Sequence, residues 1–356
     1  MAAQTVQLPL RHLVVACGAE LCSTAFLKSW GRVLLCPLFL KKASTGKPNP
    51  YLCLMRIIFM GTPEFAVPSL DVLLRQGYDL AGVVTAPDKP GGRLGIIQSA
   101  IKQYAVAQGL RVLQPDKLKN QDFLAALQSL RADLQVVVAF RMLPEVVWQM
   151  PPLGTLNLHG SLLPKYRGAA PINWAIINGE TETGVTTFLL RHEIDTGDIL
   201  FQDTLPIGEH DTAGELHDRM MHTGADLVLR TVQALERGTA QPQPQPAGAA
   251  THAPKLSTDT CRIDFARSAG EVHNFVRGLS PHPGAWTLLD GKTFKILRAS
   301  PVASEEDFLP GEFFSDGKST LKISTLRGFL QVHELQMEGK RRMTTREFLN
   351  GYRLGQ

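Results

Sequence analysis

Short apolar runs that alternate with helical segments constrain the fold of this chain more than any other sequence feature. The apolar runs lie at residues 56–60, 80–87, 110–115 and 132–140. The segments between them repeat apolar residues at the three- to four-residue spacing of amphipathic helices. Apolar strands separated by helices are typical of a parallel sheet that helices cover on both faces. We therefore predict an α/β fold, a doubly wound and mostly parallel sheet, for residues 55–237.

The rest of the body divides into a connecting segment and a second domain. Residues 238–257 alternate proline with glutamine, which favours extended polyproline II, so we expect a semi-rigid linker; a long surface loop is the alternative. Residues 258–356 contain short strands with turn signals, including a hairpin predicted across Asp290 and Gly291. They predict a small C-terminal β-barrel or sandwich.

The first 54 residues differ in composition from everything that follows. They carry six basic residues, one acidic residue and four of the five cysteines, and they end just before Met55, which opens an apolar strand. We interpret residues 1–54 as an atypical extension. It arises either from a start codon assigned too far upstream or from a leader such as an organelle transit peptide.

Several classes of protein find no support in the sequence. No apolar stretch approaches the roughly 18 to 20 residues that span a bilayer, so we expect no membrane partner. Cys261 is the only cysteine after residue 54, which excludes a disulfide framework and leaves no cluster at metal-ligand spacing; we expect no metal. Serine-hydrolase, dinucleotide and P-loop motifs are also missing from the sequence.

The stretch "NLHG" at residues 157–160 ends an apolar strand, where doubly wound sheets bind ligands. Asn157 and His159 project on the same side because strand side chains repeat every two residues. By position alone, His159 is as consistent with a structural histidine as with a catalyst, and Asp195 in "EIDTG" with a turn residue. Together, an Asn, a His and a carboxylate suit acyl transfer to an amine, because donors stabilise the oxyanion and a carboxylate handles the proton.

These residues belong to two segments, "NLHGSLLPKYRGAAPI" and "GVTTFLLRHEIDTGDIL", that closely resemble the methionyl-tRNA formyltransferase family. The Asn-x-His pair with an Asp 36 positions after the His is specific to the wider group of formyltetrahydrofolate-dependent transferases. The segments "LLPKYRGAAP", "PDKPGGR" and "IDFARSAGEVHNFVRGLSPHPGAWT", with the proline-rich connection, narrow the resemblance to the tRNA enzymes. The resemblance runs from Met55 into the C-terminal domain.

The resemblance implies a Rossmann-like formyltransferase domain, an OB-like C-terminal barrel and a reaction. The enzyme would transfer the formyl group of 10-formyltetrahydrofolate to the free α-amino group of methionyl-initiator tRNA, giving N-formylmethionyl-tRNA for translation initiation. Transfer would be direct, through a tetrahedral intermediate. Asn157 and His159 would hold the formyl oxygen, and Asp195 would orient His159 and assist proton removal. The implied folate contacts are Ser161, Leu162, Leu163, Pro164 and Phe140.

The resemblance also implies contacts with tRNA. Arg93 matches an arginine on a loop that reaches the acceptor stem, but "LGII" follows it where the family generally has lysines, and the loop is about one residue shorter. Basic side chains of the second domain suit phosphate contacts, although each also fits a solvated charged face. They are Lys292, Lys295, Arg298, Lys340, Arg341 and Arg342.

Two rival functions remain open at this point. One is a sister formyltransferase that acts on a small amine such as glycinamide ribonucleotide or an amino sugar. The other is a folate- or tRNA-binding protein without turnover. For the main interpretation we expect a cytoplasmic monomer, or an enzyme of the mitochondrial or another organelle matrix if residues 1–54 are a transit peptide.

Overall fold

The computed structural model describes residues 55–91, 95–246, 248–304, 306 and 308–354. The predictions for the extension 1–54 and for Arg93 therefore concern residues outside the described part. Within that part, no helix has the length and apolar character needed to cross a membrane.

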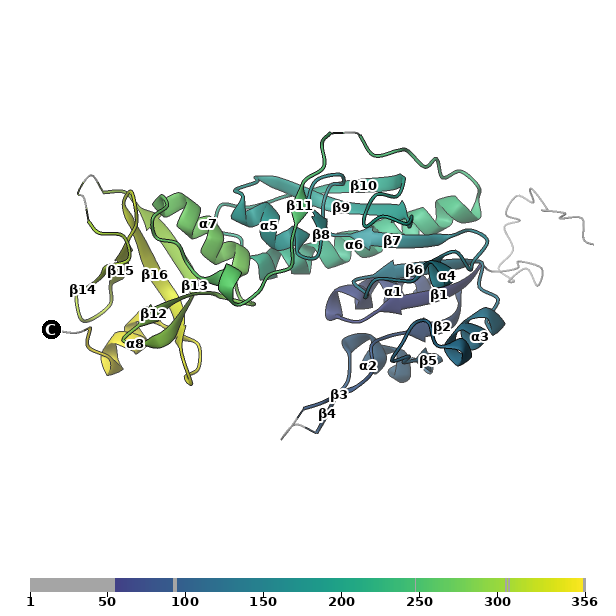
Figure 1. The fold of residues 1–356 in the computed structure, drawn as a ribbon, viewed down its shortest axis with the longest axis horizontal. Helices are drawn as coiled ribbons and strands as arrows, with labels where there is room; N and C mark the ends of the chain where they lie inside the picture. The colour runs from purple at the N-terminus through teal and green to yellow at the C-terminus, as the bar shows by residue number, and fades with distance from the viewer. Residues whose placement is uncertain (1–54, 92–94, 247, 305, 307, 355–356) are drawn as a thin grey trace, which may run out of the picture. The chain divides into compact units, whose positions relative to one another are not determined.

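The first part of the described chain is built on a seven-stranded sheet (Figure 1). Its strands are β1 (Arg56–Gly61), β2 (Asp79–Val84), β5 (Val112–Leu113), β6 (Leu134–Val138), β7 (Thr155–His159), β9 (Glu182–Leu189) and β10 (Ile199–Pro206). The spatial order is β10-β9-β7-β6-β1-β2-β5. The five strands from β7 to β5 run parallel, and β9 and β10 add two antiparallel pairings at one side. The predicted doubly wound, mostly parallel sheet is confirmed.

Helices cover both faces of this sheet. They are η1 (Glu64–Ala66), α1 (Val67–Arg75), α2 (Ala100–Ala107), α3 (Gln121–Ser129), α4 (Glu145–Trp148), α5 (Pro171–Ile177) and α6 (Ala213–Glu236). Strand β1 shows why both faces are apolar: Ile57 and Phe59 enter the core under α1 and α6, whereas Ile58 and Met60 enter the core under α3. Because alternate side chains point to opposite faces, a strand buried on both faces is apolar throughout.

The start of the long helix α6 follows the capping rules expected from its sequence. Thr212 accepts a hydrogen bond from the backbone N–H of Glu215 at 3.3 Å, and the Glu215 carboxylate accepts one from the Thr212 N–H at 2.9 Å. This reciprocal capping box satisfies two backbone donors that a helix start leaves unpaired.

The C-terminal part is a curled antiparallel sheet with the form of an open half-barrel. Its elements are η3 (Asp259–Cys261), α7 (Ala269–Leu279), β12 (Ala285–Leu289), β13 (Lys292–Val302), β14 (Phe313–Ser315), β15 (Leu321–Ser324), β16 (Phe329–Met337), β17 (Met343–Thr344) and α8 (Thr345–Gly351). The order is β12-β13-β16-β15-β14, with β17 paired to β16. Strands β12 and β13 form the predicted hairpin; Asp290 (φ 49°) and Gly291 (φ 73°) occupy the left-handed region that such two-residue turns require.

Two small pairings join segments outside these sheets. β3 (Lys89–Pro90) pairs with β4 (Ile96–Ile97), and β8 (Arg167–Gly168) pairs with β11 (His252–Ala253). The second pairing means that the proline- and glutamine-rich connection lies along the first sheet domain and hydrogen bonds to it. The sequence indicated its extended backbone but not this attachment, because polyproline patterning says nothing about the partners of the intervening side chains.

Candidate active site

The candidate site is a cavity of about 720 Å³ beyond the carboxyl ends of β6 and β7. Its lining includes Phe65, Phe140, Trp148, Asn157, His159, Asp195 and His217. Parallel strands β6 and β7 end side by side, so the residues that close them reach the same edge of the sheet. The loop between β9 and β10 brings Asp195 to this edge from a part of the chain 36 residues after His159.

His159 is held by its ring on the inner side of the cavity. The side chain is 6% exposed, and Nε2 lies 2.9 Å from the backbone oxygen of Tyr166. A carbonyl oxygen only accepts, so Nε2 carries the proton and donates it to Tyr166. The hydrogen bond therefore leaves Nδ1 as the ring nitrogen with a free lone pair.

Tyr166 supplies this carbonyl from a fixed position. Burial raises the pKa of the Tyr166 phenol to about 12, and the adjacent Glu180 carboxylate adds to the rise. The phenol therefore stays neutral and donates to Glu180 at 2.8 Å. The Tyr166 N–H is also used, because it donates to the Thr251 hydroxyl at 2.8 Å. Hydrogen bonds from its backbone N–H and from its phenol therefore hold Tyr166, whose backbone oxygen accepts the His159 hydrogen bond, in place.

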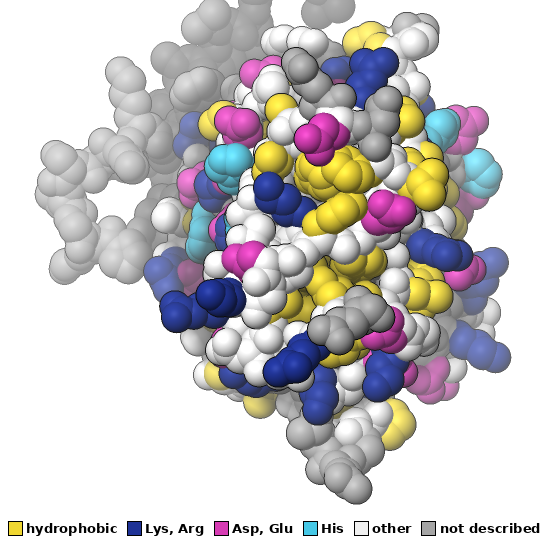
Figure 2. Space-filling model, turned by 90° about the vertical axis from the view of Figure 1, so that its left-hand side faces the viewer, with side chains coloured by type: hydrophobic (Ala, Val, Ile, Leu, Met, Phe, Trp, Pro, Cys, Tyr) yellow, Lys and Arg dark blue, Asp and Glu magenta, His cyan; other side chains and the backbone are white. Residues whose placement is uncertain are grey.

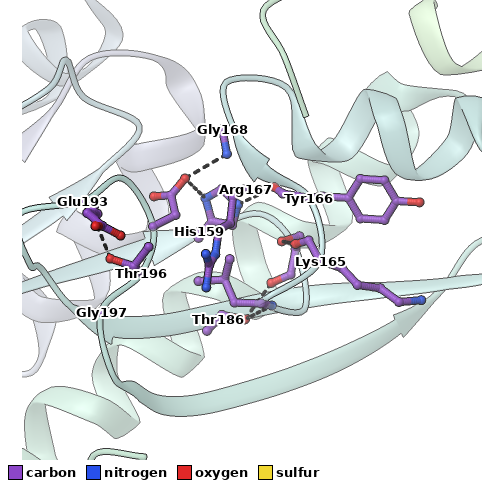
Figure 3. Close-up of polar contacts among 12 residues, drawn as sticks. His159, Lys165, Tyr166, Arg167, Gly168, Thr186, Glu193, Thr196 and Gly197 are labelled. Carbon is purple, nitrogen blue, oxygen red and sulfur yellow. Dashed lines mark hydrogen bonds and ion pairs between the residues drawn. The ribbon is translucent and has the colours of Figure 1, made fainter. Parts of the chain in front are cut away.

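Asp195 faces the other ring nitrogen. Its Oδ2 lies 3.8 Å from His159 Nδ1, too far for a hydrogen bond but close enough for electrostatic stabilisation of an imidazolium. The same oxygen accepts the Gly168 N–H at 2.9 Å, so the carboxylate has one fixed donor (Figure 3). Asp195 adopts a φ of 54°, which non-glycine residues rarely do. Asp195 thus has the backbone conformation of a turn residue, and its carboxylate also faces His159.

Gly168 is required at its position by both its backbone and its neighbours. Its φ is 122°, and a β-carbon there would lie 2.6 Å from the backbone oxygen of Ala253. The N–H that Asp195 accepts therefore comes from a residue that only glycine can fill.

Asn157 lines the cavity from the strand position two residues before His159. It is partly exposed, and no hydrogen bond joins its side chain to another residue of the described chain. Its amide is consequently available to donate to a ligand. The structure brings Asn157, His159 and Asp195 together, as the sequence predicts. Phe140, one of the predicted folate contacts, lines the same cavity.

The predicted folate stretch Ser161–Pro164 is not part of this lining. The Ser161 hydroxyl donates to the backbone oxygen of Lys165 at 2.6 Å, and the Leu163 N–H donates to the Thr186 hydroxyl at 3.1 Å. Leu162 packs so closely on Gly184 that a β-carbon there would lie 2.5 Å from its Cδ2. This stretch shapes the turn after β7, and its contact with folate stays a prediction.

Some residues of the site gave little sequence signal. Tyr166 acts through its backbone oxygen and Gly168 through its backbone N–H, so neither has a chemically distinctive side-chain role. Phe65 and His217 come from η1 and α6, and their rings lie 5.1 Å apart at the cavity wall. For these residues, the one signal in the sequence was that Gly168, in "KYRG", is a glycine. In the described chain, no cluster of three or more His, Cys, Asp or Glu suits a metal ion.

The predicted tRNA contacts of the C-terminal part are dispersed and mostly paired. Arg298 forms an ion pair with Glu215 at 2.5 Å, Arg341 one with Glu347 at 2.8 Å and Arg342 one with Glu334. The Lys295 ammonium donates to the backbone oxygen of Pro283 at 2.9 Å. Lys292, the first residue of β13, and Lys340, in the turn after β16, are exposed. Figure 2 views this part of the molecule and shows its basic side chains scattered among acidic and apolar ones.

Comparison with known families and proteins places the chain in a family. Residues 55–232 match the formyl transferase family, and residues 255–353 match the formyl transferase C-terminal domain. The fold and the site thus define an enzyme of the formyl transferase class. Proteins named methionyl-tRNA formyltransferase from Parabacteroides distasonis and Bacteroides fragilis are 53% and 49% identical to it, each match covering 84% of this chain and 96% of the relative. The chain belongs to the methionyl-tRNA formyltransferase family.

Solved structures share the fold at lower identity. The sugar 3N-formyl transferase WlaRD has a TM-score of 0.59 at 21% identity, over 81% of this chain and 99% of that one. HypX from Aquifex aeolicus in complex with tetrahydrofolic acid has a TM-score of 0.59 at 21% identity, over 83% of this chain and 47% of that one. These likenesses establish the formyltransferase fold.

Proposed function

We propose that this protein transfers the formyl group of 10-formyltetrahydrofolate to the α-amino group of methionyl-initiator tRNA. The observation that carries the proposal is one cavity lined by Asn157, His159 and Asp195 in a chain about half identical to methionyl-tRNA formyltransferases. The solved relative that holds tetrahydrofolic acid supports a folate as formyl donor. The product would be N-formylmethionyl-tRNA.

The first requirement is an amine that is already nucleophilic. A free α-amino group has a pKa of about 7.7–8.0, so a useful fraction is neutral at physiological pH. Attack on the formyl carbon forms the new carbon–nitrogen bond and places negative charge on the formyl oxygen. The unpaired Asn157 amide is the donor for that oxygen, and one such donor contributes about 2.7–4 kcal/mol to the transition state.

Proton movement falls to His159 and Asp195. Since Nε2 donates to Tyr166, neutral His159 presents an unprotonated Nδ1 that accepts the proton shed by the attacking nitrogen. The imidazolium then faces the Asp195 carboxylate at 3.8 Å. Its Nδ1 gives the proton to the departing folate nitrogen. Collapse of the intermediate breaks the bond between the formyl carbon and that nitrogen, which leaves protonated. No covalent enzyme intermediate is required.

Recognition of the tRNA is the less localised part of the proposal. Lys292 and Lys340, which are exposed, would contact phosphates directly. Arg298, Arg341 and Arg342 would first exchange their carboxylate partners for phosphate, and Lys295 would exchange its carbonyl partner. Arg93, which lies outside the described residues, remains the predicted contact at the acceptor stem.

The decisive experiment measures transfer of labelled formyl groups from 10-formyltetrahydrofolate. Methionyl-initiator tRNA is the test acceptor, and uncharged tRNA, glycinamide ribonucleotide and an amino sugar nucleotide are controls. We expect product only with the charged tRNA. Transfer to a small amine but not to the tRNA would favour a sister enzyme, and tight binding without any transfer would favour a non-catalytic protein.

A further inference from the structure

The connection between the two sheet domains is attached to the candidate active site along much of its length. Gln243 exchanges two backbone hydrogen bonds with Ile199, each 2.8 Å long. Further on, the Thr251 backbone oxygen accepts the Arg167 N–H at 2.9 Å, and the Ala253 backbone oxygen accepts the Ala169 N–H at 2.8 Å. The connection therefore spans both loops that place groups around His159.

Gln245 stands out within this connection because its side chain points inward. It is partly buried, whereas its neighbours Pro244 and Pro246 are exposed. Its amide nitrogen donates to the backbone oxygens of Asp195 at 2.7 Å and Gly197 at 2.9 Å. Its amide oxygen accepts from the Arg167 guanidinium at 3.1 Å from Nε and 2.5 Å from Nη2. Both amide donors and the amide acceptor are used.

The loop that carries Asp195 needs such a support. Residues 191–194 just before it are exposed, and Asp195 itself adopts the left-handed φ of 54°. A non-glycine residue keeps such a conformation only where its surroundings impose it. Gly168 holds the Asp195 side chain, and Gln245 holds its backbone oxygen. Gln245 also joins Arg167, the residue before Gly168, so the two loops are clamped to each other.

We infer that Gln245 is a positioning residue, by which the interdomain connection completes the active site. Its amide fixes the Asp195 loop against the Arg167–Gly168 segment and thereby sets the carboxylate opposite His159 Nδ1. Gln245 acts through Asp195 and does not line the cavity. The inference rests on the proposed function, since it assigns Gln245 to the same site and the same reaction.

Two variants separate the donor and acceptor halves of the Gln245 contact, and a third is the control. Gln245→Met keeps the length and removes every hydrogen bond. Gln245→Glu keeps an acceptor for Arg167 but cannot donate to the Asp195 and Gly197 oxygens. Gln243→Ala is the matched control, because the exposed Gln243 is attached by its backbone only.

We expect Gln245→Met and Gln245→Glu to lower kcat by about 10- to 100-fold with little change in KM. The Gln243→Ala variant should keep wild-type kcat. In an Asp195→Ala background, Gln245→Met should cause no further loss, because a residue that acts through Asp195 has nothing left to position. Additive losses, or a wild-type kcat in both Gln245 variants, would overturn the inference.

Hydrogen exchange followed by mass spectrometry tests the same inference without turnover. In Gln245→Met, backbone amides of residues 166–170 and 191–198 should exchange faster than in wild type, and the remaining described chain should not. Unchanged exchange in those peptides would reject the positioning role even if the enzyme is active. If Gln245→Met exchanges faster in those peptides but the wild-type protein transfers no formyl group, the positioning role stands and the proposed function is rejected.

Discussion

The two sheet domains place their predicted functional residues in opposite ways. In the first, Asn157, His159 and Asp195 converge on one cavity, and His159 and Asp195 are mostly buried and fixed by backbone hydrogen bonds. In the second, the predicted tRNA contacts are spread over separate strands and turns, and several are already paired. A chemical step needs a few groups held closely, whereas phosphate recognition adds many weak contributions. Single substitutions should therefore have large effects in the first domain and small ones in the second.

The largest effect is expected at the three proposed catalytic residues. Asn157→Ala, His159→Ala and Asp195→Ala should each lower kcat by about 100- to 1000-fold, because the proposed mechanism uses Asn157 and His159 at the reacting atoms and Asp195 to stabilise the His159 imidazolium. Formyl transfer kinetics measure the loss, and circular dichroism checks that the fold is kept. His222→Ala and Asp226→Ala, exposed positions on α6, are the matched controls. Wild-type rates in all three site variants would contradict the contrast between the domains.

Gly168→Ala should come next. The new β-carbon would meet the Ala253 oxygen at 2.6 Å in a backbone that is strained for alanine, so the β8–β11 pairing and the donor to Asp195 both suffer. We expect a loss of about 1–3 kcal/mol in unfolding free energy, together with lower kcat. Urea unfolding and kinetics give the two numbers. Gly270→Ala, where a β-carbon meets open space in α7, should lower neither.

Substitutions in the C-terminal part should have smaller and graded effects on tRNA affinity. Lys292→Ala should reduce the slope of log K against log salt by about one, because it would remove one proposed phosphate contact. Arg342→Ala should reduce it less, because Arg342 gives up its pairing with Glu334 in order to bind. Filter binding across a salt series measures both slopes, with kcat at saturating tRNA unchanged. A larger effect at Arg342 would show that its ion pair orients it for phosphate.

The smallest effect concerns stability where the two domains meet. His273 on α7 is 6% exposed, and its Nε2 donates to the Glu209 backbone oxygen at 3.3 Å. Burial lowers the pKa of His273, with Arg277 and His210 adding to the decrease, so the unfolded chain takes up a proton more readily. Stability should therefore be full above about pH 6.5 and decrease as the pH falls further, by at most about 1.4 kcal/mol per pH unit from this one group.

Urea unfolding between pH 5 and 8 measures this decrease, with His273→Gln as the test variant and the exposed His222→Ala as control. The test variant should lose part of the slope below pH 6.5, and the control should keep it. An unchanged slope in His273→Gln would show that other groups account for the pH dependence.

Local patterns in the sequence were sufficient to predict features that depend on residues close together in the chain. The apolar runs predicted the parallel sheet because a strand covered on both faces must be apolar on both. Asp290–Gly291 predicted the β12–β13 hairpin, since such turns need a positive φ at both positions. The pairing of Asn157 with His159 followed from the two-residue repeat of a strand.

Only the tertiary structure decided how distant segments act on one another. Sequence spacing placed Asp195 36 residues from His159 but did not show which ring nitrogen it faces, because that depends on the Tyr166 carbonyl bound to the other one. It likewise gave no reason to connect Gln245 with Asp195, 50 residues away. The sequence by itself determined the main strands and helices and the residue types of the candidate site, since those follow from local periodicity and chemistry. The clamp around Asp195 required the fold, because the Gln245 side chain bonds to backbone oxygens and to an Arg167 side chain that lie far from it in the sequence.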